Sequence, residues 1–396
     1  MSMTRRACAA LVAGLLVAGC ASAAPSRSPT ATVVAMLPAT PSVAASSGAS
    51  LPALASPSAS PGAIRGLHGT ILYARIDDPI GHLFLVDTRG VTRQISRPGA
   101  TCCLVWAPDG SAILMPASAP GDRITTATMA PDGSAYRVLP LNDPTLSLGP
   151  GAWSPDGSRI ALEGWDDKHA GREGLYTEKL DGSDRHQLTS APGGLHDLPL
   201  AWSPDGSALL LVRAGATANR GALFVVGADG TGLRQLSPAT GSVVADFWSG
   251  LPASWAPDGH AVAFTAFTTP TGADGVGAIY VADIASGAVR AIVDSTVWST
   301  TVDWSPTGDS IVFDKRAGLG SSVNVLFLVH ADGSGLAPVP GGDTGVCCAT
   351  WSPDGSQLLY ARGSDTRQLI VANVDGSGST VLTPDAAEWS WYSWVR

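Results

Sequence analysis

Residues 153–157 read Trp-Ser-Pro-Asp-Gly, and five close copies of this pentapeptide recur along the 396-residue chain. The copies begin at Trp106, Trp202, Trp255, Trp304 and Trp351. With Trp153 included, the gaps between successive copies are 47, 49, 53, 49 and 47 residues. A nearly fixed period of this size is typical of a repeat architecture, in which each unit buries its apolar surface against the next.

Each pentapeptide lies within a longer pattern of short strand-like segments separated by turn residues. In the repeat that contains Trp153, such segments occupy residues 159–162, 174–178 and 185–188. The pentapeptide supplies Pro, Asp and Gly for one tight turn, and Asp181-Gly182 supplies another. In the copy at Trp304 the Asp is replaced by Thr307, a weaker turn residue. Four strands per repeat, joined by such turns, predict an all-β fold of four-stranded antiparallel blades.

The number of blades depends on how the two ends of the repeat region are interpreted. The six pentapeptides alone predict six blades. Residues 70–74, 82–86 and 91–95, however, match the last three strands of a repeat, and residues 391–395 match a first strand. Because the two fragments complement each other, we expect a seventh blade built from both termini, with Trp394 as its repeated tryptophan. The prediction is a seven-bladed β-propeller, with six blades as the alternative.

The repeat resembles that of the TolB-type β-propellers, a WD-repeat-like family with Trp-Ser-Pro-Asp-Gly after the inner strand and Asp-Gly-Ser before the outer one. The resemblance covers residues 66–396 and implies the propeller fold and a secreted setting. Family members include periplasmic scaffold proteins, propeller halves of serine peptidases and some polysaccharide lyases. TolB itself has six blades and an N-terminal α/β domain, whereas a tether precedes the repeats here. Since no Gly-x-Ser-x-Gly motif occurs either, the resemblance implies a fold and not an activity.

The first 20 residues have the pattern of a bacterial lipoprotein signal. Arg5 and Arg6 form a basic start, and residues 9–18 are apolar but too short to span a bilayer as a helix. Residues 16–20, Leu-Val-Ala-Gly-Cys, resemble a lipobox. We therefore expect lipidation of Cys20 and an extracytoplasmic protein anchored to a bacterial membrane, at the cell surface or in the periplasm. An ordinary secretory signal with an incidental Cys is the alternative.

The chain divides into a signal at residues 1–19, a lipidated cysteine and tether at 20–65, and the propeller at 66–396. The tether consists almost entirely of small residues, Pro, Thr and Val, a composition that favours disorder. Residues 1–65 hold four of the 24 basic residues and none of the 33 acidic ones, which leaves the propeller with a net charge of −13. This charge argues against nucleic-acid binding. We expect a monomer that touches the membrane only through its lipid.

Loop lengths vary on one face of the predicted ring, where second strands lead to third strands and where the chain enters each inner strand. Variable loops on a rigid scaffold commonly carry binding sites. The candidate ligand- or partner-binding residues on this face are Trp165, His196, Asp197, Asp246, Trp248, Trp298 and Trp389. Aromatic and acidic side chains suit a saccharide, a cation-bearing ligand or a protein partner. The alternative is that these tryptophans cap the core beneath long loops.

Catalytic and metal-ligating patterns are weak in this sequence. The seven histidines are scattered over blades and turns, and paired aspartates lack the spacing of an EF-hand. We therefore predict no catalytic residue, metal or cofactor. The leading hypothesis is a non-catalytic scaffold that binds a protein or a saccharide. The alternatives are a propeller enzyme, a polysaccharide lyase or hydrolase acting through the same face, and a sensor of small molecules or metals.

Two adjacent cysteine pairs, Cys102-Cys103 and Cys347-Cys348, each lie three and four residues before a motif tryptophan. They therefore occupy equivalent positions in the two blades that flank the closing blade. Four cysteines allow three connectivities, and an oxidising compartment favours disulfides. A bridge between the pairs, or a four-thiolate metal site, would have to reach past a whole blade. We favour two vicinal disulfides as rigid rim elements, with the other pairings and free thiols left open.

Overall fold

The structure is a computed structural model of the chain, and it describes strands, turns and loops over most of residues 66–395. The described ranges are 66–75, 82–95, 104–121, 123–169, 171–215, 220–239, 242–244, 252–267, 277–293, 301–316, 323–340, 345–363, 368–383 and 389–395. Within these ranges the regular elements are β-strands and short turns, and no helix of membrane-spanning length and hydropathy occurs.

The strands form seven antiparallel sheets, which we call blades 1 to 7, each with its inner strand first below. Blade 1 contains β29 (Trp389–Trp394), β1 (Ile71–Arg75), β2 (His82–Val86) and β3 (Thr92–Gln94). Blade 2 contains β4 (Val105–Trp106), β5 (Ile113–Ala119), β6 (Arg123–Met129) and β7 (Arg137–Val138). Blade 3 contains β8 (Ser147–Trp153), β9 (Ile160–Trp165), β10 (Gly174–Glu178) and β11 (His186–Gln187).

Blades 4 to 7 repeat this order. Blade 4 contains β12 (Leu195–Trp202), β13 (Ala208–Gly215), β14 (Arg220–Gly227) and β15 (Arg234–Gln235), with β16 (Val243–Val244) also paired to β14. Blade 5 contains β17 (Ala253–Trp255), β18 (Ala261–Phe267), β19 (Gly277–Asp283) and β20 (Val289–Val293). Blade 6 contains β21 (Val302–Trp304), β22 (Ser310–Arg316), β23 (Asn324–His330) and β24 (Ala337–Pro338). Blade 7 contains β25 (Val346–Trp351), β26 (Gln357–Arg362), β27 (Gln368–Asn373) and β28 (Thr380–Val381).

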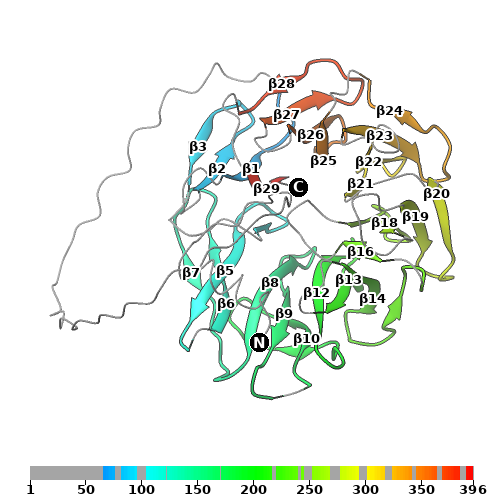
Figure 1. Ribbon diagram of the computed structural model, residues 1–396. Coiled ribbons are helices and arrows are strands. Elements are labelled where there is room, and N and C mark those ends of the chain that lie inside the picture. The colour runs from blue at the N-terminus through cyan, green and yellow to red at the C-terminus, as the bar shows by residue number, and fades with distance from the viewer. Residues whose placement is uncertain are drawn as a thin grey trace, which may run out of the picture.

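The blades are arranged in a ring with their inner strands around a common axis (Figure 1). Blade 1 is completed by β29 from the far end of the chain, which pairs antiparallel with β1, with Trp394 opposite Ile71 and Tyr392 opposite Tyr73. The expected seven-bladed propeller closed by both termini is thus confirmed, and the six-bladed alternative is wrong.

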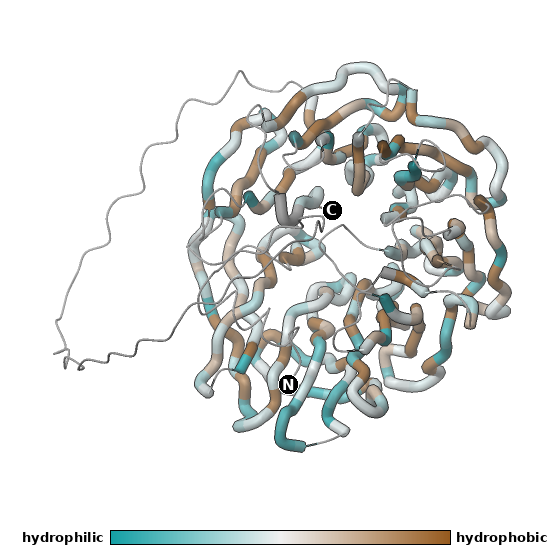
Figure 2. The backbone as a smooth tube through the Cα atoms, viewed as in Figure 1, coloured by the Kyte–Doolittle hydropathy of each residue, from teal (hydrophilic) through white to brown (hydrophobic). Residues whose placement is uncertain are grey.

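The apolar side chains are buried between neighbouring blades, and this packing holds the ring together. Seven clusters of buried apolar side chains occur, and each combines residues of two neighbouring blades. Successive residues of one strand serve opposite neighbours: Ile160 and Leu162 pack toward blade 2, while Ala161 packs toward blade 4. Figure 2 shows hydrophobic stretches of the chain in blades all around the ring, interrupted by hydrophilic ones.

The repeated tryptophan ends the inner strand of every blade, and Trp394 takes this position in blade 1. Four indole N–H groups donate across the blade boundary to the carbonyl that precedes the tryptophan of the neighbouring blade. These bonds run from Trp153 to Val105 (3.2 Å), Trp202 to Ala152 (3.3 Å), Trp255 to Ala201 (3.4 Å) and Trp351 to Asp303 (3.1 Å). Trp304 instead donates to Gly308 in its own turn, at 3.1 Å. The motif therefore joins blades by hydrogen bonds as well as by packing.

The turn after the tryptophan is closed by its own side chains. The Ser154 hydroxyl donates to Asp156 at 2.6 Å, and Gly157 adopts a φ of 70°, a conformation that favours glycine. Hydrogen bonds from Ser154 and Ser158 lower the pKa of Asp156 to about 2. In the Trp304 copy, Asp309 takes over this role, since Ser305 and Thr307 both donate to its carboxylate, at 2.9 and 2.6 Å.

We expect the same substitution, tryptophan to phenylalanine, to cost more at residue 202 than at residue 394. Trp202→Phe removes a cross-blade hydrogen bond, whereas the buried indole nitrogen of Trp394 has no hydrogen-bond partner to lose. The free energy of unfolding should therefore fall by about 1 kcal/mol more in Trp202→Phe. Urea titrations of both variants measure the difference. An equal or larger loss in Trp394→Phe would contradict this role of the indole bond.

Candidate ligand site on the loop face

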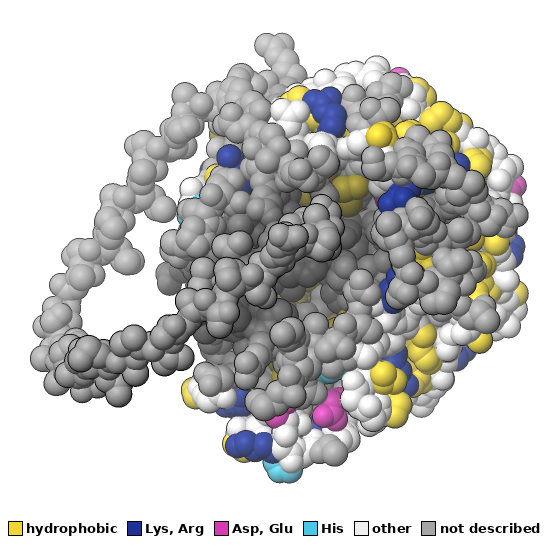
Figure 3. Space-filling model, in the orientation of Figure 1, with side chains coloured by type: hydrophobic (Ala, Val, Ile, Leu, Met, Phe, Trp, Pro, Cys, Tyr) yellow, Lys and Arg dark blue, Asp and Glu magenta, His cyan; other side chains and the backbone are white. Residues whose placement is uncertain are grey.

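We call the loop face the end of the ring where inner strands begin and where second strands lead to third strands. It lies opposite the Trp-Ser-Pro-Asp-Gly turns, because every inner strand runs from this face to its tryptophan. Figure 3 shows acidic, basic and histidine side chains gathered over blade 3. Among the side chains that the structure describes on this face, we consider those of blades 3 and 4.

Glu163 of β9 and His196 of β12 form a pair across the boundary between blades 3 and 4. The Nδ1 atom of His196 lies 2.9 Å from Oε1 of Glu163, and only 8% of the His196 side chain is exposed. The Nε2 atom of His196 is buried and has no hydrogen-bond partner. When Nδ1 carries the proton and donates it to Glu163, Nε2 is an unsatisfied acceptor. A buried polar atom in this state costs about 1–3 kcal/mol, so a donor from a ligand would stabilise it.

Trp165, at the end of β9, shares a face of blade 3 with Glu163. Trp165 lies opposite Ser147 and Glu163 opposite Gly149 in the β8–β9 pairing, and residues two apart on a strand point to the same side. The indole lies close over Gly149: a Cβ atom placed there would be 3.4 Å from Cζ3 of Trp165. The missing side chain at Gly149 therefore lets a half-buried aromatic ring lie over the inner strand, beside the Glu163–His196 pair.

A salt-bridge network fixes the loops next to this pair. Arg172 contacts Oδ2 of Asp143 at 2.5 Å and Oδ2 of Asp166 at 2.8 Å, and Thr145 donates to Asp166 at 2.6 Å. Burial alone would raise the pKa of Asp166, but hydrogen bonds, first of all from Thr145, lower it to about 2. These ion pairs and hydrogen bonds hold the loop that enters blade 3 against the loop that follows Trp165.

Asp197 was expected to face a ligand, and the structure places it inside the boundary between blades 3 and 4. Its side chain is fully buried, with Arg213 donating to both oxygens at 2.6 and 2.7 Å and Thr189 donating at 2.5 Å. The two carboxylate oxygens are therefore taken up by protein donors. The neighbouring His196 keeps a nitrogen atom without such a partner.

The structure does not describe the side chains of the other residues predicted for this face. Asp246, Trp248 and Trp298 lie outside the described residues, as do Cys20, Cys102 and Cys103. Trp389 is described only by its backbone, which pairs with Arg75 in blade 1. Of the predicted binding residues, the structure brings together Trp165 and His196 in blades 3 and 4.

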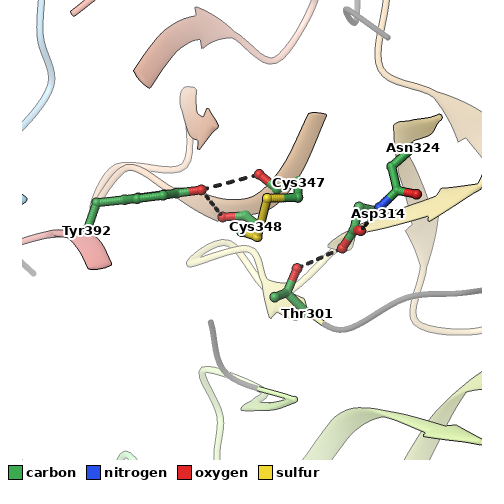
Figure 4. Close-up of a disulfide and its surroundings, with 6 residues drawn as sticks. All are labelled: Thr301, Asp314, Asn324, Cys347, Cys348 and Tyr392. Atoms are coloured by element: carbon green, nitrogen blue, oxygen red, sulfur yellow. Dashed lines mark hydrogen bonds between the residues drawn. A yellow bond between two sulfur atoms is a disulfide. The ribbon is translucent and has the colours of Figure 1, made fainter. Parts of the chain in front are cut away.

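Cys347 and Cys348 are joined by a disulfide at the start of β25, with their Cα atoms 3.7 Å apart. The single O–H of Tyr392 in β29 donates a bifurcated hydrogen bond to the carbonyl oxygens of Cys347 and Cys348, at 3.2 and 2.9 Å (Figure 4). Asp314 of β22 is drawn beside this bridge and accepts hydrogen bonds from Thr301 at 2.9 Å and Asn324 at 2.8 Å. Burial raises the pKa of Asp314 to about 6.

Sequence reasoning missed Glu163 and Asp314, although both interrupt apolar strands. Glu163 follows Ile160-Ala161-Leu162 and Asp314 follows Ile311-Val312-Phe313. An acidic residue at such a position has to find a partner or change its protonation state. That signal could have identified both residues, but not the histidine or the amide that each one contacts. Among the described residues, no group of three or more His, Cys, Asp or Glu side chains is arranged to hold a metal ion.

The fold and its repeats define the class of protein as a β-propeller, and comparisons with known proteins agree. No protein-family model matches the chain. A segment of 95 residues is 36% identical to the Tol-Pal system protein TolB of Alcanivorax borkumensis, which covers 24% of this chain and 18% of that protein. Together, the repeats and this short match support a TolB-type propeller. The chain matches less than a fifth of that relative's length. The match therefore supports no conclusion about the activity of this chain.

Two solved structures illustrate the same fold. An oligogalacturonate lyase in complex with manganese superposes with a TM-score of 0.57 over 80% of this chain and 90% of the lyase, at 14% identity. A puromycin hydrolase superposes with a TM-score of 0.57 over 84% of this chain and 54% of the hydrolase, at 16% identity. At such low identity these likenesses concern the fold alone.

We expect Asp314 to make the protein less stable as the pH rises from about 4 to 7. Its pKa is raised in the folded state, so its contribution to stability is complete below the unfolded pKa and is lost as the pH rises through about 6. Asp314→Asn keeps a side chain that can accept the Thr301 hydrogen bond but cannot ionise. Urea titrations at pH 4 and pH 7 should show a smaller pH dependence in the variant. Identical pH dependence in both proteins would show that Asp314 does not titrate in this range.

Proposed function

We propose that this protein is an extracytoplasmic binding module whose propeller captures a saccharide on the loop face, between blades 3 and 4. The observation that carries the proposal is the Glu163–His196 pair, in which a buried nitrogen of His196 has no hydrogen-bond partner. A hydroxyl of a bound sugar is a donor of the right kind for that nitrogen.

Trp165 supports a saccharide over other polar ligands. Its half-buried ring lies beside Glu163 on the same face of blade 3, and sugar rings pack well against aromatic faces. The Glu163 carboxylate, whose side chain is 23% exposed, supplies an acceptor at the same place. An aromatic surface combined with one acceptor nitrogen and one carboxylate matches a ligand that carries both C–H faces and hydroxyl groups.

The test is a panel of neutral and acidic oligosaccharides, screened against the purified protein and followed by titration calorimetry of the sugars that bind. Trp165→Ala and His196→Gln should each weaken binding at least about tenfold, the loss expected when an aromatic contact or a buried hydrogen bond is removed. Tyr136→Ala, which removes an exposed aromatic ring of blade 2 outside the site, is the matched control and should bind normally. If no saccharide binds and a protein partner is recovered by cross-linking instead, the ligand class is wrong.

A polysaccharide-cleaving enzyme is the second candidate function, and the same pair favours it. A carboxylate that orients an imidazole is a common arrangement for moving a proton to or from a substrate. Sugars found in the binding screen should therefore also be incubated with the protein and analysed for shortened products. Cleavage that is lost in His196→Gln would favour the enzyme, whereas binding without products would favour the binding module.

We also propose that the propeller is held at a membrane surface by a lipid on Cys20. The support is the sequence of the first 65 residues alone: a basic start, a short apolar stretch, the lipobox-like residues 16–20 and a long tether of small residues. A single lipidated terminus anchors a protein without crossing the bilayer. The tether would then keep the loop face free to meet a ligand away from the membrane.

Replacing the proposed lipid attachment residue should release the protein from membranes. In a bacterial expression host, the wild-type chain should partition into the detergent phase of Triton X-114, and Cys20→Ala should remain in the aqueous phase. Mass spectrometry of the wild-type N-terminus should find diacylglyceryl on Cys20. An unmodified N-terminus that begins elsewhere would instead indicate an ordinary secretory signal.

A further inference from the structure

The Cys347–Cys348 bridge lies where blade 7 meets the strand that closes the ring. Both cysteines are half-buried in β25, the inner strand of blade 7, and Tyr392 belongs to β29, the inner strand of blade 1. Figure 1 shows β25 and β29 as neighbours around the axis of the ring. The bifurcated hydrogen bond from the Tyr392 hydroxyl therefore connects β29, the closing strand of blade 1, to the inner strand of blade 7.

The backbone at this bridge departs from that of an ordinary strand. Cys348 has a φ of 67°, and a bulge separates Cys347 from Thr350 in the pairing of β25 with β26. Among the described residues other than glycine, only Ala135 and Asp184 share a positive φ, and both lie outside strands, in the connections before β7 and β11. A left-handed residue inside a strand is unfavourable unless something holds it there. The covalent link between two adjacent side chains supplies that constraint.

The contact with Tyr392 depends on the same irregular backbone. In a regular strand, successive carbonyl groups point to opposite sides, so one hydroxyl group cannot reach both. Here the carbonyl oxygens of Cys347 and Cys348 lie 3.2 and 2.9 Å from a single tyrosine oxygen. The bridge, the left-handed Cys348 and the Tyr392 contact thus form one unit, and loss of the bridge would release the other two.

We propose that Cys347–Cys348 is a thiol–disulfide exchange site whose reduction loosens the closing strand β29. A thiolate of an external dithiol attacks one sulfur to form a mixed disulfide, and the other cysteine leaves as a thiolate that takes up a proton. The second thiol of the reductant then attacks its own sulfur in the mixed disulfide, which frees the second cysteine and leaves the reductant as a cyclic disulfide. Two electrons and two protons pass to the protein. Cys348 then relaxes to an extended conformation, and Tyr392 loses its two acceptors.

The test measures amide hydrogen exchange of residues 389–395 in the full chain, with and without excess dithiothreitol. All proteins carry Cys102→Ser and Cys103→Ser, so that the reductant acts on a single pair of adjacent cysteines. Reduction should speed exchange in β29 about fivefold, as expected for the loss of one net hydrogen bond. Alkylation followed by mass spectrometry confirms in each sample whether the pair is bridged or free.

Two paired variants separate the bridge from the backbone conformation that it holds. Cys347→Ala/Cys348→Gly has no bridge, but glycine adopts the left-handed conformation readily, so exchange in β29 should stay slow with or without reductant. Cys347→Ala/Cys348→Ala should exchange rapidly in both conditions. Tyr392→Phe, which keeps the bridge but lacks the hydroxyl, should exchange rapidly and gain little further from reduction.

Three results would overturn the proposal. The first is a pair of free thiols at Cys347 and Cys348 in protein purified without reductant. The second is unchanged exchange in β29 after complete reduction of the bridge. The third is equal exchange rates in the Ala-Gly and Ala-Ala variants, which would show that the conformation of residue 348 does not control the closing strand.

Discussion

Every blade of this protein depends on its neighbours for the burial of its apolar residues. Each of the seven apolar clusters joins two blades, and alternate residues of a strand such as β9 serve opposite clusters. A single blade would leave both of its faces in water, and a row of blades would leave two faces exposed at its ends. Closure of the ring by β29 is therefore the constraint on which the other contacts depend. Four of the repeated tryptophans add a cross-blade hydrogen bond at the end of their inner strands.

The same constraint explains why the polar chemistry gathers at the boundaries between blades. Glu163 and His196 belong to different blades, so this pair exists only because the ring holds two sheets side by side. The Asp143–Arg172–Asp166 network joins the loop that enters blade 3 to the loop that follows Trp165. The ring thus holds a histidine with an unpaired nitrogen and a tryptophan at one blade boundary, and the proposed saccharide site rests on this arrangement.

The sequence predicted the ring well because the turn residues and the nearly constant spacing of the tryptophan motif both determine the fold. The sequence also placed Trp394 correctly, because the three strands predicted near the start of the repeats lacked an inner strand and the one predicted at the end supplied it. It predicted side-chain partners poorly, because these contacts depend on the register and twist of the strands, which the order of residues along the chain does not reveal. Asp197 shows this: its position in the chain suggested a ligand, yet Arg213 and Thr189 occupy its oxygens. Glu163 was not predicted as a site residue because the sequence around it does not indicate that it contacts His196.

Blade 1 joins residues 71–94 to residues 389–394, and this has a consequence for how the protein comes to be folded. At an elongation rate of about 5–20 residues per second, roughly 15–60 s pass between the synthesis of the first three strands of blade 1 and that of its inner strand. During this time an unpaired edge of β1 is available to other chains. The protein therefore has to be kept from premature association until its last strand arrives, and export before folding would postpone that risk to the far side of the membrane.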